Sequence, residues 1–135
     1  MADIHTPLCP KQTLCYLSLP LLATFVCLRL YLHLVHVRHA YPGGYLVHHL
    51  FIGALIVLPA SYLLAFGVHS RSLAILVRVS LGIGSGLILD ELTYLVATQA
   101  SDADYVSRLS LSGAAVFVSS ALIFLLVLYR LHRCD

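Results

Sequence analysis

Two pairs of adjacent ionisable residues, His48-His49 and Asp90-Glu91, lie in stretches of this sequence that are otherwise almost wholly apolar. Imidazole and carboxylate groups bind divalent metals, and together they also transfer protons. An ionisable side chain at the centre of a membrane helix costs roughly 2.5 to 3.5 kcal/mol, so it requires a partner or a purpose. These four residues are therefore the first candidates for functional chemistry.

Further polar residues gather near the first pair. Arg29 lies one helical turn before His33 and could reach the acids. Five of the eight histidines lie between positions 33 and 49: His33, His36, His39, His48 and His49.

The overall composition places these residues in a membrane protein. Of the 135 residues, 60% are hydrophobic and only 10% are charged, whereas soluble domains carry about a quarter charged residues. Eight basic and six acidic residues give a net charge of +2, too small and too scattered for nucleic-acid binding. We therefore expect one polytopic membrane domain over residues 1–135, with the lipid bilayer as its partner.

Four apolar segments have the length of a membrane span, for which roughly 20 residues are needed. Their apolar runs are continuous rather than alternating, which excludes outer-membrane strands. The sequence thus predicts an all-α membrane protein, an antiparallel bundle of four transmembrane helices. The segments are residues 13–34, 45–66, 73–96 and 109–129.

Basic residues in short loops predict the orientation of the bundle, because they collect on the cytoplasmic side. With four spans, both termini share a side, and that side carries most of the basic loop residues. Both termini are therefore expected in the cytoplasm, in a multi-pass protein of the plasma or inner membrane. A homo-oligomer or a larger membrane complex stays open. The basic residues on the terminal side are Lys11, Arg71, Arg130 and Arg133.

The second and third segments form a hairpin that turns near Ser70, so residues equally distant from this turn lie at equal depth. This register places His48 level with Glu91 and His49 level with Asp90. It also places Gly53 opposite Gly86.

Small residues mark the helix-packing face of the third segment. Gly82 and Gly86 have the spacing that allows close helix approach, and Asp90 continues the same stripe. On the second segment, His49 and Gly53 share a stripe. Asp90 and His49 should therefore point into the bundle, with Gly53, Gly82 and Gly86 as packing residues.

The cluster predicts a divalent-metal site near the non-cytoplasmic face. Nitrogen and oxygen ligands without thiolate suit Zn, Fe or Mn. No H-E-x-x-H or E-x-x-H motif is present, so the assignment depends on clustering alone. The candidate ligands are His33, His48, His49, Asp90 and Glu91, and the residues expected around them are Arg29, His36, Tyr45 and Tyr94.

Four other functions stay open from the same residues. The His and acid pairs could only fix helix packing in a structural or accessory membrane subunit, or relay protons or ions in transport. Haem could bind between His33 and His48 or His49. A lipid-acting enzyme could use Asp90 or Glu91 as a base, although no nucleophile elbow or phosphate loop is present.

Arg78, near the inner end of the third segment, is expected to extend towards the membrane surface.

Overall fold

The computed structural model describes residues 8–34, 48–98 and 102–132, and all of their regular secondary structure is helical. The predicted all-α fold is confirmed. The first, third and fourth predicted segments each lie within a slightly longer helix. The helices are α1 (Pro10–Leu34), α2 (His49–Ala65), α3 (Arg71–Ala97), α4 (Asp102–Tyr105) and α5 (Arg108–His132).

Three of these helices, α1, α3 and α5, are long and apolar enough to cross a membrane. With 25 residues, α1 and α5 are each about 37 Å long. The described part of α2 has 17 residues and is about 25 Å long, shorter than a typical hydrocarbon core. The predicted second span began at Tyr45, and residues 45–47 lie outside the described residues.

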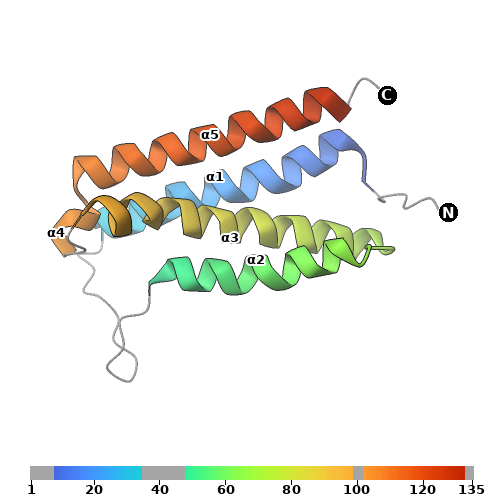
Figure 1. The fold of residues 1–135 in the computed structure, drawn as a ribbon, viewed down its shortest axis with the longest axis horizontal. Coiled ribbons are helices and arrows are strands. Elements are labelled where there is room, and N and C mark those ends of the chain that lie inside the picture. Colours follow the sequence, from blue (N-terminus) through green and yellow to red (C-terminus); the bar gives the residue numbers. More distant parts are fainter. Residues whose placement is uncertain (1–7, 35–47, 99–101, 133–135) are drawn as a thin grey trace.

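Helix α3 is the centre of the molecule, because it packs against α1, α2 and α5. Figure 1 shows α1 and α2 on opposite sides of α3, with successive long helices running antiparallel. Helix α1 also contacts α5, whereas α2 packs mainly against α3. The arrangement therefore differs from a square bundle, in which each helix has two neighbours of equal importance.

Two faces of α3 carry glycines that allow close packing. A Cβ atom on Gly82 would lie 2.5 Å from the Leu17 carbonyl oxygen of α1, and Gly86 faces α1 as well. Gly84 faces α2, where a Cβ atom on Gly53 would lie 2.6 Å from the Gly84 carbonyl oxygen. The predicted opposition of Gly53 and Gly86 is therefore wrong. Positions 84 and 86 are about 200° apart around the helix, so they face different neighbours.

Candidate functional site: a buried polar cluster

The polar cluster lies near the end of α3 and consists of six side chains from four helices and the residue before α2. Asp90 lies on the same face of α3 as Gly82 and Gly86, and this face packs against α1. Glu91 lies two helical turns beyond Gly84 and so faces α2. Asp90 is 0% exposed and Glu91 is 2% exposed. The cluster members are Arg29, His48, His49, Asp90, Glu91 and Tyr105.

Both carboxylate oxygens of Asp90 are occupied by side chains of other helices. Oδ1 accepts a hydrogen bond from Nε of Arg29 at 2.5 Å. Oδ2 lies 3.2 Å from Nε2 of His49 and accepts a hydrogen bond from the Tyr105 hydroxyl. Asp90 therefore ties α3 to α1, α2 and α4 at one point.

Arg29 links α1 to α3, α4 and α5 through several acceptors. Its Nη1 donates to the Tyr105 carbonyl oxygen at 2.9 Å, and its Nη2 donates to the Asp90 carbonyl oxygen at 3.0 Å and to Oγ of Ser110 at 3.3 Å. The guanidinium carbon also lies 4.9 Å from the centre of the Tyr105 ring, within the range of a cation–π contact. The expectation that Arg29 reaches the acids is confirmed.

Glu91 holds the beginning of α2. The backbone N–H of Leu50 donates to its Oε2 at 2.7 Å, and residue 48, the N-cap of α2, supplies no side-chain cap. First-turn N–H groups have no partner within their own helix, so Glu91 supplies an acceptor and a favourable charge. Its Oε1 contacts Nδ1 of His48, and its Oε2 lies 3.4 Å from Nδ1 of His49.

Aromatic rings shield the carboxylates. Tyr94 is fully buried, and its ring centre lies 4.9 Å from that of Tyr105 and 6.0 Å from that of His48. Burial, together with the Asp90 carboxylate, raises the pKa of the Tyr105 phenol. Tyr105 therefore stays protonated and donates to Asp90. Hydrogen bonds in such a water-poor setting are electrostatically stronger than in water.

The predicted depth register agrees with the contacts, since His48 meets Glu91 and His49 meets Asp90. His33 does not join them. Its side chain is exposed in the last turn of α1, and helix α1 contributes Arg29 to this depth instead. His36 and Tyr45 lie outside the described residues.

The described residues contain no group of three or more His, Cys, Asp or Glu side chains arranged to hold a metal ion. The reason is visible in the contacts of the acids. Asp90 is turned towards Arg29 and Tyr105, and Glu91 is turned towards the first turn of α2. The predicted metal site is therefore not supported by the geometry of this part of the chain.

Two members of the network were missed at the level of sequence. Tyr105 follows a polar break between two apolar segments, and Ser110 resembles a packing residue of α5. Neither has a spacing relative to Asp90 that signals a contact. Only the packing of α4 and α5 against α1 and α3 brings them to Arg29.

No protein-family model, curated protein or solved structure matches this chain. In the part of the chain that the structure describes, the fold and the cluster define a small helical protein with three helices long and apolar enough to cross a membrane. One end of its helices is joined by a buried network of charged and polar groups.

Proposed function

We propose that the chain is a small multi-pass protein of the plasma or inner membrane, with α2 as a fourth span and the polar cluster near the non-cytoplasmic face. The surface supports this location. Large apolar side chains are exposed along all four long helices, with Leu34 79%, Leu55 71% and Leu131 66% exposed. In water, apolar patches of this extent are rare on a monomer. Lipid contact accounts for them.

The proposed role of the polar cluster is structural: it fixes how the helices pack, and the chain acts as a structural or accessory membrane subunit. One observation carries this proposal. Both oxygens of Asp90 and both oxygens of Glu91 interact with donor groups of this same chain. A buried network whose members are all satisfied favours one packing arrangement, whereas a ligand site keeps acceptors available for the ligand.

A double-mutant cycle on Arg29 and Asp90 tests the structural role. Asp90→Leu leaves a buried guanidinium without its carboxylate and should lower the free energy of unfolding by about 3 to 5 kcal/mol. The double variant Arg29→Met with Asp90→Leu removes both charges and should recover much of that loss. Thermal unfolding in detergent micelles measures both effects.

The exposed cation Arg108 provides the control for this cycle. Arg108→Met should leave the unfolding temperature close to that of the wild type. A wild-type unfolding temperature for Asp90→Leu would contradict the structural role.

Divalent-metal binding is the second candidate, with Zn, Fe or Mn as the metal. One observation favours it: Nδ1 of His48 faces the Glu91 carboxylate. In metal proteins, such a carboxylate orients an imidazole to bind through its other nitrogen. Elemental analysis of protein purified without chelator should then show metal that His48→Gln loses. Metal-free wild-type protein would reject this candidate, and an absorbance spectrum of the same sample tests for haem.

A further inference from the structure

Arg78 is a buried cation at the opposite end of α3 from the polar cluster. It is 6% exposed, so other side chains of the protein cover it. Its Nη1 donates to the Ala74 carbonyl oxygen at 3.0 Å. No other hydrogen bond and no ion pair of Arg78 occurs within residues 8–34, 48–98 and 102–132. A guanidinium has five N–H donors, so most of those of Arg78 have no acceptor within these described ranges.

A groove of about 290 Å³ opens beside Arg78 between α1, α3 and α5. Its polar groups are Thr13, Tyr129 and His132, and most of its remaining wall consists of leucine side chains of α1 and α5. Arg78 is therefore the charged group of a largely apolar site.

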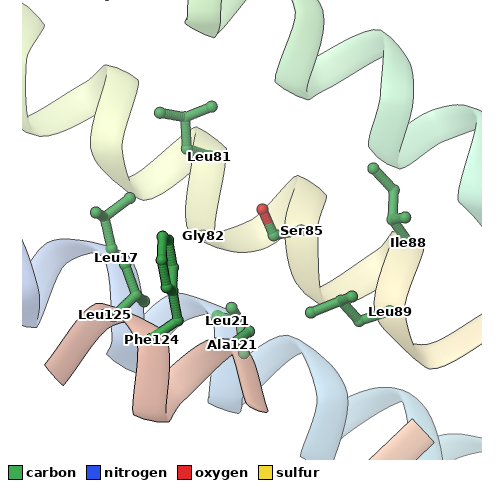
Figure 2. A pocket seen from close by; sticks show the side chains of 10 residues that line it. All are labelled: Leu17, Leu21, Leu81, Gly82, Ser85, Ile88, Leu89, Ala121, Phe124 and Leu125. Carbon is green, nitrogen blue, oxygen red and sulfur yellow. The ribbon is translucent and has the colours of Figure 1, made fainter. Parts of the chain in front are cut away.

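This groove continues along α3 into a second one. Leu17 and Leu125 line both, and the second groove has a volume of about 230 Å³ and reaches Leu89. Figure 2 shows Leu17 of α1 and Leu125 of α5 close to Gly82 of α3. From residue 78 to residue 89, the two grooves together follow α3 for about 16 Å. We refer to them as the α1/α5 groove.

The charge around Arg78 favours an anion. The acids Asp90 and Glu91 begin 12 residues further along α3, about 18 Å away, and the remaining acids of the described chain follow in α4. At the end of the molecule that holds Arg78, all charged side chains within the described ranges are basic, and histidines accompany them. These residues are Lys11, His69, Arg71, Arg78, Arg130 and His132.

We propose that Arg78 binds the phosphate of an anionic membrane phospholipid whose acyl chain lies in the α1/α5 groove. A guanidinium binds phosphate through two parallel hydrogen bonds. Free phosphate would satisfy Arg78 but would leave the apolar walls uncovered. In a zwitterionic lipid, the ammonium of the headgroup offsets the phosphate charge. The inference rests on the membrane location proposed above.

Native mass spectrometry of the detergent-solubilised protein tests the charge requirement. Phosphatidylglycerol should bind at least about tenfold more tightly than phosphatidylcholine with the same acyl chains. Arg78→Gln should abolish this preference, and Arg78→Lys should retain part of it. Arg71→Gln, which removes an exposed cation of the same helix, should behave as the wild type does.

A second variant tests the acyl site and does not depend on Arg78→Gln folding. Leu125→Trp places a large ring where the two grooves meet. It should weaken binding of long-chain phosphatidylglycerol while leaving that of a short-chain analogue unchanged.

Three results would overturn the inference: equal affinity for the two lipids, an equal effect of Arg71→Gln and Arg78→Gln, or displacement of the lipid by inorganic phosphate as readily as by phosphatidylglycerol. The last result would identify a soluble-anion site. If the protein stays soluble and monodisperse without detergent, the membrane location itself fails. These outcomes are thus distinguishable.

Discussion

Tyr105 has two roles in the polar cluster, because its hydroxyl donates to Asp90 and its ring covers Arg29. Its burial, and the negative charge beside it, disfavour the phenolate. The folded protein therefore keeps Tyr105 neutral at a pH at which an unfolded tyrosine, with a pKa of 10.0, loses its proton.

Stability should accordingly fall as the pH rises above about 10. A raised folded-state pKa contributes stability that is fully present below the pKa of the unfolded tyrosine and is lost above it. Tyr105→Phe should lower the unfolding temperature at neutral pH, since one hydrogen bond to a buried carboxylate is lost, worth roughly 1.5 to 3 kcal/mol. The unfolding temperature of Tyr105→Phe should also fall less at alkaline pH than that of the wild type. Thermal unfolding of both proteins across this pH range measures the difference.

The exposed residue Tyr62 provides the control. Tyr62→Phe should follow the alkaline decrease of the wild type. Parallel pH profiles for wild type and Tyr105→Phe would contradict the assigned environment of Tyr105.

At the scale of elements, the two glycine faces of α3 decide how closely α1 and α2 approach. Gly82→Val would place a side chain against the backbone of α1, where a Cβ atom alone would be 2.5 Å from the Leu17 carbonyl oxygen. Backbone cannot move aside as a flexible side chain can. We expect a loss of about 1 to 3 kcal/mol in the free energy of unfolding, measured by denaturation in mixed micelles.

Ile83→Val, at the next position, is the matched control. Ile83 is 36% exposed, so losing one methylene there should change stability by less than about 1 kcal/mol. Equal stability of the two variants would mean that α1 does not pack closely at Gly82.

At the scale of the whole molecule, one exposed cysteine just before α1 and another within it can test whether α1 lies in a bilayer and in which orientation. Cys9 precedes α1, at the end that holds Arg78, and Cys27 is exposed near the other end of α1. In a background in which the other two cysteines, the exposed Cys15 and Cys134, are replaced by serine, a charged maleimide should label Cys9 only after cells are permeabilised. Cys27 should react only with an apolar maleimide.

Labelling of Cys9 in intact cells would reverse the proposed orientation. Labelling of Cys27 by the charged reagent in intact or permeabilised cells would contradict burial of α1 in lipid. A Cys9→Ser variant identifies which site reacts.

The sequence by itself determined the helical class, the approximate bounds of the three longest helices and the contacts of His48 with Glu91 and of His49 with Asp90. These properties follow from local rules: apolar length sets the helices, and a short turn sets the register of two adjacent helices. Only the tertiary structure decided that Gly84, and not Gly86, meets Gly53.

Tertiary structure likewise decided that Tyr105 joins the polar cluster and that Ser110 accepts a hydrogen bond from Arg29. It also placed Arg78 in a groove between α1 and α5. These contacts join helices that are distant along the chain. Their rotation and neighbours depend on how all the side chains pack at once, and no spacing within a single segment encodes that.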